Sequence, residues 1–209
     1  IAALTYNYVH KLASKGQYVP DIILAGGFAF EDDIFKAMAL GAPYVKAVGM
    51  ARSPLCAAHV GKLIAEQINK NAVDKTIEPY GRTMEEIFVL ASRTKRLFSS
   101  NGKEVPAGAL GVYSYYQRLS QGLRQLMCGS RKFALEHLTR NDIVTLTREA
   151  AEVTGIKYIM DADSEEAEQI LSGKEKTKAK TVVKSMPKQK PKPKVTPKPK
   201  AKPKGKAKK

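Results

Sequence analysis

Two short apolar runs, each followed by glycine and then by a helical pattern, organise the first third of the chain. The first run covers residues 21–25 between Pro20 and Gly26, and the second covers residues 44–48 before Gly49. Continuous apolar runs of this length are typical of strands covered on both faces, as in a parallel sheet. Helical spacing surrounds them in residues 3–15, in residues 31–40, and from Pro54 to about Asn69. Strands that alternate with helices in this way predict an α/β fold built from βα units.

The predicted sheet has too few strands to stand by itself. Two strands do not make a stable parallel sheet, and the chain begins at Ile1 directly in a helical pattern. We therefore expect residues 1–73 to be the C-terminal part of a larger barrel whose other strands lie upstream.

From about residue 74 the pattern becomes mostly helical. Amphipathic spacing predicts helices over residues 83–98 and 112–128, joined by a glycine-containing loop at 99–111. The pattern also predicts a helix from a cap at Thr139 or Asn141 to about Thr154, a short strand or extended piece at 156–160 and a last helix around 165–171. We interpret residues 74–172 as a helical extension that packs on the barrel, and residues 173–209 as a separate tail.

The charge of the chain is concentrated in that tail. The formal net charge is +16, from 36 basic and 20 acidic residues. Sixteen lysines and one glutamate fall within 174–209, so this segment carries +15 and residues 1–173 carry only +1. The tail has too few large apolar residues to offset its ordering entropy, and we expect it to be disordered. Such a charge also predicts weak association with nucleic acid or anionic lipid.

Other residue types narrow the class of protein. Cys56 and Cys128 form no Cys-x-x-Cys motif, so we expect small core thiols in a reduced, cytoplasmic protein without a metal site in this stretch. No apolar run approaches the roughly 20 residues of a membrane span. We expect His10, His59 and His137 on helix surfaces or partly buried, and the pair Asp161 and Asp163 in a helix-capping turn. Three tyrosines (Tyr113, Tyr115 and Tyr116) could stack on a ring, although their helical spacing favours packing against the barrel.

The constellation that indicates chemistry is the pair of glycine turns after the two strands. These turns are Gly26-Gly27 and Gly49-Met50-Ala51-Arg52, one βα unit apart. In a (β/α)8 barrel the loops after strands seven and eight commonly bind phosphate. Glycine lets the backbone approach the anion, and helix N-termini add unpaired N–H donors. A Gly-Gly pair alone is usually only a turn, but two such turns directly after apolar strands predict a phosphate-bearing ligand.

The same residues resemble a known family. Residues 23–28 (Ile-Leu-Ala-Gly-Gly-Phe), 33–42 (Asp-Ile-Phe-Lys-Ala-Met-Ala-Leu-Gly-Ala) and 48–52 (Val-Gly-Met-Ala-Arg) are similar to the last two βα units of FMN-dependent barrels. Together with residues 125–133, Gln-Leu-Met-Cys-Gly-Ser-Arg-Lys-Phe, they most resemble the FMN-binding glutamate synthase-like family.

This resemblance implies a fold, a cofactor and a reaction. It implies strands seven and eight of a (β/α)8 TIM barrel, with the FMN phosphate held by Gly26, Gly27, Gly49, Met50, Ala51 and Arg52. It also implies formation of L-glutamate from 2-oxoglutarate, with reduced FMN as the hydride carrier. Catalytic residues, flavin-ring contacts and the ligands of any iron–sulfur cluster would belong to upstream strands. Ala25 stands where many relatives have Asp or Ser, so the resemblance fixes no ring contact.

Two alternatives stay open on the sequence alone. One is another phosphate-binding barrel, acting on a hydroxy acid or on a nucleotide in the manner of inosine monophosphate dehydrogenase. The other is a non-catalytic protein that binds polyanions through its tail.

Overall fold

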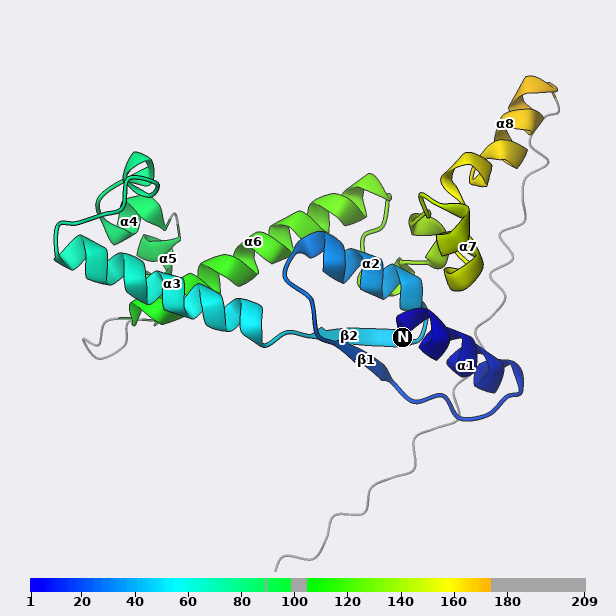
Figure 1. Cartoon of the computed structure of the whole chain (residues 1–209), viewed down its shortest axis with the longest axis horizontal. Coiled ribbons are helices and arrows are strands. Elements are labelled where there is room, and N and C mark those ends of the chain that lie inside the picture. Colours follow the sequence, from blue (N-terminus) through cyan, green and yellow to red (C-terminus); the bar gives the residue numbers. More distant parts are fainter. Residues whose placement is uncertain (89, 99–104, 174–209) are drawn as a thin grey trace, which may run out of the picture.

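The computed structural model describes residues 1–88, 90–98 and 105–173, and Figure 1 shows the arrangement of their helices and strands. The predicted tail therefore lies outside the described residues, apart from Gly173. The α-helices and strands are α1 (Ala2–Ser14), β1 (Ile22–Ala25), α2 (Glu31–Gly41), β2 (Val45–Gly49), α3 (Arg52–Asn69), α4 (Met84–Ile87), α5 (Ala91–Phe98), α6 (Ala107–Gly129), α7 (Arg148–Thr154) and α8 (Ser164–Leu171). Short 3-10 helices lie between some of them.

The first five elements confirm the predicted order of helices and strands. β1 and β2 pair in parallel, with Ile22 opposite Val45 and Ala25 opposite Gly49, and α2 connects them. Within the described residues the sheet has these two strands and does not close into a barrel. Each strand therefore has one edge without a partner strand in this part of the chain.

One face of the sheet is covered by a small core. Phe35 and Met38 of α2 pack with Val45 of β2, and Met127 of α6 and Leu138 complete the buried cluster. The opposite face is open, because Ile23 is 64% exposed. Within the described residues α2 lies against one face only and no described element covers Ile23, so the expected cover on the second face stays a prediction.

A second packing unit joins α3 and α6, which lie side by side in Figure 1. Small residues let the two backbones approach closely. A Cβ added at Gly61 of α3 would lie 2.6 Å from the carbonyl oxygen of Ala107, and one at Gly111 of α6 would lie 2.3 Å from that of Ala57. The predicted loop at 99–111 is therefore wrong in its last part, since α6 already begins at Ala107 and uses its glycines for helix packing.

Three further predictions on secondary structure need correction. The helix expected over 83–98 is divided into α4 and α5, since the backbone of Phe88 is extended. The helix expected from a cap at Thr139 or Asn141 to about Thr154 is only α7, whose N-cap residue is Thr147. The Thr147 hydroxyl accepts a hydrogen bond from the N–H of Ala150. The short strand or extended piece expected at 156–160 is extended only up to Tyr158, which makes a single bridge to Thr145, because a 3-10 turn follows immediately.

Arg140 ties the helical extension to the βα units. Its guanidinium lies 3.8 Å above the ring of Tyr6 in α1, donates to the carbonyl of Leu40 at 2.5 Å and donates to the carbonyl of Thr154. These carbonyls lie at the C-terminal ends of α2 and α7, where the helix dipole favours a cation. Partial burial lowers the pKa of the Arg140 guanidinium, which stays charged at neutral pH because an arginine pKa lies so far above it.

Candidate phosphate-binding site

The two glycine turns meet at one edge of the sheet. Because β1 and β2 are parallel and Ala25 is opposite Gly49, both strands end at the same level and their following turns are neighbours. Gly49 lies so close to β1 that an added Cβ would be 3.2 Å from the Cβ of Ala25. The structure thus brings together the two sequence segments in which we predicted the site.

The first turn has a backbone that favours glycine. Gly26 has φ = 101° and Gly27 has φ = 79°, both in the left-handed region where L side chains are strained. A Cβ added at either position would meet no heavy atom within 4 Å. The glycines are therefore required by backbone conformation rather than by crowding within the described chain, and the space beside them is open to a ligand.

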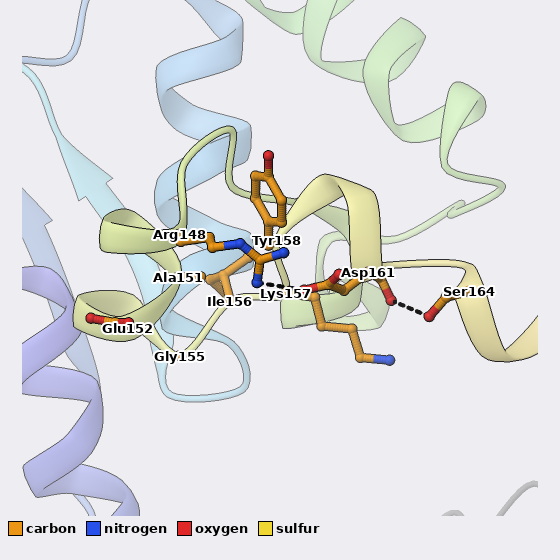
Figure 2. Close-up of a pocket in the computed structure, with 9 residues that line it drawn as sticks. All are labelled: Arg148, Ala151, Glu152, Gly155, Ile156, Lys157, Tyr158, Asp161 and Ser164. Atoms are coloured by element: carbon orange, nitrogen blue, oxygen red, sulfur yellow. Dashed lines mark hydrogen bonds and ion pairs between the residues drawn. The ribbon is translucent and has the colours of Figure 1, made fainter.

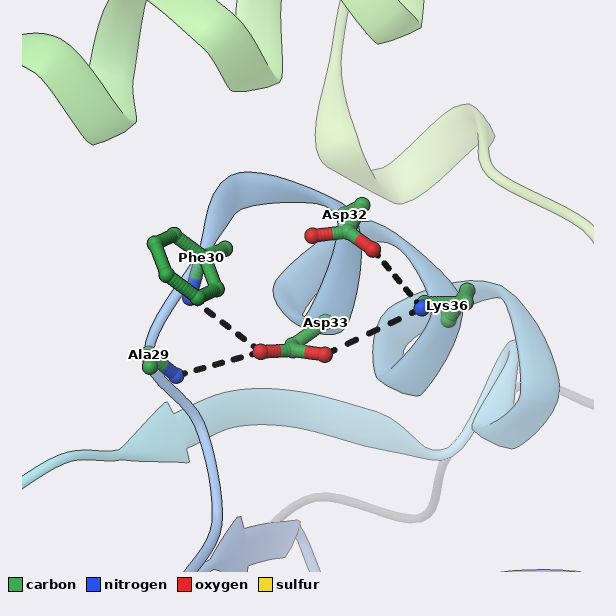
Figure 3. A network of polar contacts seen from close by, with 5 residues as sticks. All are labelled: Ala29, Phe30, Asp32, Asp33 and Lys36. Atoms are coloured by element: carbon green, nitrogen blue, oxygen red, sulfur yellow. Dashed lines mark hydrogen bonds and ion pairs between the residues drawn. The ribbon is translucent and has the colours of Figure 1, made fainter.

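The N-terminus of α2 is unfavourable for an anion, and Figure 3 shows the polar contacts around its first turn. The Asp33 carboxylate accepts hydrogen bonds from the N–H groups of Ala29 at 3.2 Å and Phe30 at 3.1 Å. Lys36 contacts Asp32 at 2.8 Å and Asp33 at 3.8 Å. The hydrogen bond between Lys36 and Asp32 lowers the pKa of Asp32 and raises that of Lys36. With Glu31 the first turn of α2 holds three acidic residues, which repel a phosphate.

The N-terminus of α3 has the opposite character. Its N-cap residue is Ala51, no side chain caps the helix, and no acidic residue lies in the first turn. Arg52 is the first helical residue and is exposed. The free N–H groups and dipole of such a helix end attract anions, and an adjacent guanidinium adds to the attraction. Of the two helices that follow the glycine turns, α3 is the one suited to phosphate.

A hydrogen bond across the site links the two turns. The Ser53 hydroxyl in the first turn of α3 donates to the carbonyl oxygen of Phe28 at 2.8 Å. Sequence analysis missed Ser53 because its partner lies 25 residues away and a serine in a helical first turn carries no signal for such a contact. The bond fixes the start of α3 next to the Gly26-Gly27 turn.

A pocket of about 430 Å³ lies on one side of the first turn. Its lining includes Gly26, Gly27 and Phe28, with Lys36 from α2 and Thr145 from the extension. Gly49, Met50, Ala51 and Arg52 do not line it. The six predicted site residues therefore share one edge of the sheet, but only the two glycines of the first turn open into this pocket.

A second pocket, of about 520 Å³, lies in the C-terminal part and is drawn in Figure 2. Arg148 stacks over the ring of Tyr158 at 4.8 Å and contacts Asp161 at 3.4 Å, while the Ser164 hydroxyl donates to the Asp161 carbonyl at 3.1 Å. The side chains of Arg148 and Asp161 are more than half exposed and neutralise each other. The helix-capping turn expected at Asp161 and Asp163 is confirmed in position, since Asp163 is the N-cap residue of α8. The Asp163 side chain makes no capping hydrogen bond, and the Asp161 side chain pairs with Arg148 instead.

The remaining candidate residues do not assemble into a site. His10, His59 and His137 are exposed, as predicted, and His10 Nδ1 lies 2.9 Å from the Tyr44 hydroxyl. Cys56 and Cys128 are also exposed, so the prediction that they are core residues is wrong: each lies on the outer side of its helix. Among the described residues no group of three or more His, Cys, Asp or Glu could hold a metal ion.

Comparison with known proteins identifies no relative of this chain. No family model, no curated protein and no solved structure matches the chain. In the described part of the chain, no helix is both long and apolar enough to cross a bilayer.

Proposed function

We propose that this chain holds the FMN phosphate site of a flavin-dependent oxidoreductase of the glutamate synthase type. One observation carries the proposal: two parallel strands end together beside a left-handed Gly-Gly turn and the uncapped, acid-free N-terminus of α3. A phosphate dianion needs several N–H donors and no blocking side chains, and this edge of the sheet provides both.

The residues fit the phosphate group of FMN. Backbone amides of Gly26 and Gly27 would contact it from one side, and those of Ala51 and Arg52 from the other. The Arg52 guanidinium would add a charge-assisted contact. FMN itself supplies hydride transfer, whereas the protein supplies binding and orientation. The substrate pair, 2-oxoglutarate and L-glutamate, rests on the sequence resemblance.

We further propose that β1 and β2 are strands seven and eight of a (β/α)8 barrel. Among the described residues each strand has one edge without a partner strand, and Ile23 is 64% exposed. Both observations support this, since such edges and apolar faces are normally covered. The packing of α6 on α2 and α3 agrees with a helical extension that lies outside the barrel.

The test is a comparison of flavins on the full-length protein. We expect the purified protein to be yellow and to release FMN, and the apoprotein to bind FMN at least ~100-fold more tightly than riboflavin, which lacks the phosphate. Release of a nucleotide monophosphate would instead favour the barrel of the inosine monophosphate dehydrogenase type. A colourless protein that binds riboflavin and FMN equally weakly would contradict the proposal.

The charge of residues 174–209 favours a second candidate function, polyanion binding. Sixteen lysines give this segment a net charge of +15, and each phosphate neutralised by a lysine releases counterions. We expect DNA binding that weakens steeply with added salt and disappears when the protein is truncated after Gly173. Binding that survives truncation would contradict a role for the tail, because residues 1–173 carry only +1.

A further inference from the structure

We infer that Tyr115, in the helical extension, is a positioning residue for the phosphate-binding turn. Its hydroxyl donates a hydrogen bond of 2.6 Å to the carbonyl oxygen of Ala29, across 86 residues of sequence. Ala29 lies two residues after Gly27, in the loop between β1 and α2. The inference rests on the function proposed above, because it assigns Tyr115 a role in that same site.

The loop after the glycines is held by side chains from three helices. Tyr115 of α6 binds the carbonyl of Ala29, and Ser53 of α3 binds the carbonyl of Phe28. Asp33 of α2 accepts the N–H groups of Ala29 and Phe30. With these four backbone groups engaged, the end of the loop is fixed, and the part that faces open space is Gly26-Gly27.

The packing of α6 against α2 holds Tyr115 in position for this hydrogen bond. Tyr115 and Gly122 of α6 both lie at the start of α2, and Leu119, one turn after Tyr115, is only 5% exposed. Gly122 permits close contact, since an added Cβ would lie 2.6 Å from the Cγ of Glu31, the first residue of α2. The packing of Leu119 and Gly122, one and two turns after Tyr115, therefore fixes the helix that carries Tyr115.

This arrangement matters for an anion in two ways. A carbonyl that is not held by a donor is free to turn its negative oxygen toward the ligand, and Tyr115 prevents that rotation at Ala29. A turn that is already ordered also loses less conformational entropy when phosphate binds. The helical extension thus acts on phosphate affinity without touching the phosphate.

The experiment removes the hydroxyl alone. In the full-length protein, we expect Tyr115→Phe to weaken FMN binding by about 2- to 12-fold, the value of one hydrogen bond, and to leave riboflavin binding unchanged. Tyr116→Phe is the matched control. Tyr116 is the neighbouring tyrosine on α6, is 45% exposed, and its hydroxyl has no hydrogen bond to a described residue. A loss that is equal for both flavins would indicate a merely structural role and overturn the inference.

A second measurement separates this inference from the proposed function. Amide hydrogen exchange in the peptide that covers residues 26–30 should become faster in Tyr115→Phe and stay unchanged in Tyr116→Phe. If exchange is faster in Tyr115→Phe but the wild-type protein shows no preference for FMN, the proposed function is contradicted. Tyr115 then only holds the loop in place. A wild-type preference for FMN that Tyr115→Phe keeps in full, with unchanged exchange, would overturn the inference and leave the proposed function standing.

Discussion

Gly27→Asp is expected to abolish FMN binding in the full-length protein, with a loss of affinity of at least ~100-fold. The new carboxylate would stand beside the phosphate dianion, and two unit charges 4 Å apart repel by about 4 kcal/mol at an effective dielectric constant of 20. The left-handed φ of 79° at Gly27 adds strain, although aspartate tolerates this region better than most residues do. The measurement is titration of each purified apoprotein with FMN, followed by flavin fluorescence.

Two controls separate charge, strain and folding for this substitution. Gly27→Asn has nearly the same shape without the charge and should lose much less affinity. Gly16→Asp repeats the substitution at a glycine with φ = 66° and no heavy atom within 4 Å of its added Cβ, but after α1 rather than beside β1. It should bind FMN as the wild type does. A folded Gly27→Asp protein that retains its flavin would contradict the assignment of this turn.

The elements around the site could be predicted because local signals determine them. Pro20 and the glycines at 26, 27 and 49 bound the two apolar runs, so strand ends and the turns after them are set by residues a few positions apart. The parallel pairing of β1 and β2 then places the turns together without further information. For this reason all six predicted site residues lie at one edge of the sheet.

What the sequence did not reveal depends on contacts between distant residues. Gly108 and Gly111 look like loop residues in the sequence. Only their close contact with α3 shows that they are helix-packing residues. Sequence alone did not show which of the two helix ends is open to an anion. The structure distinguishes α3 from α2 through the capping contacts of Asp33 with Ala29 and Phe30. Tyr115 is separated from its partner Ala29 by 86 residues, so no local pattern could identify the contact.

The packing of α3 on α6 leads to the largest expected effect on stability. A Cβ at Gly111 would lie 2.3 Å from the carbonyl oxygen of Ala57 and 3.2 Å from the Cα of Gly61, both backbone atoms that cannot rotate away. Alanine is the better helix former by about 1 kcal/mol, yet the two helices would have to separate to admit it. We expect Gly111→Ala to lower the free energy of unfolding by ~2–4 kcal/mol, measured by chemical denaturation.

Gly129→Ala tests whether the effect belongs to the interface or to the helix. Gly129 is the last residue of α6, and an added Cβ there meets nothing within 4 Å, so this change should be neutral or slightly stabilising. The same interface predicts that the stability losses of two glycine substitutions do not add. A Cβ at Gly61 would meet the Ala107 carbonyl oxygen at 2.6 Å in the same helix contact. Once one methyl group has separated the helices, the second costs less, and the double variant Gly61→Ala/Gly111→Ala should lose less stability than the sum of the single changes. Strict additivity would mean that the two glycines do not share one contact, and a stabilised Gly111→Ala protein would mean that α3 and α6 do not approach each other this closely.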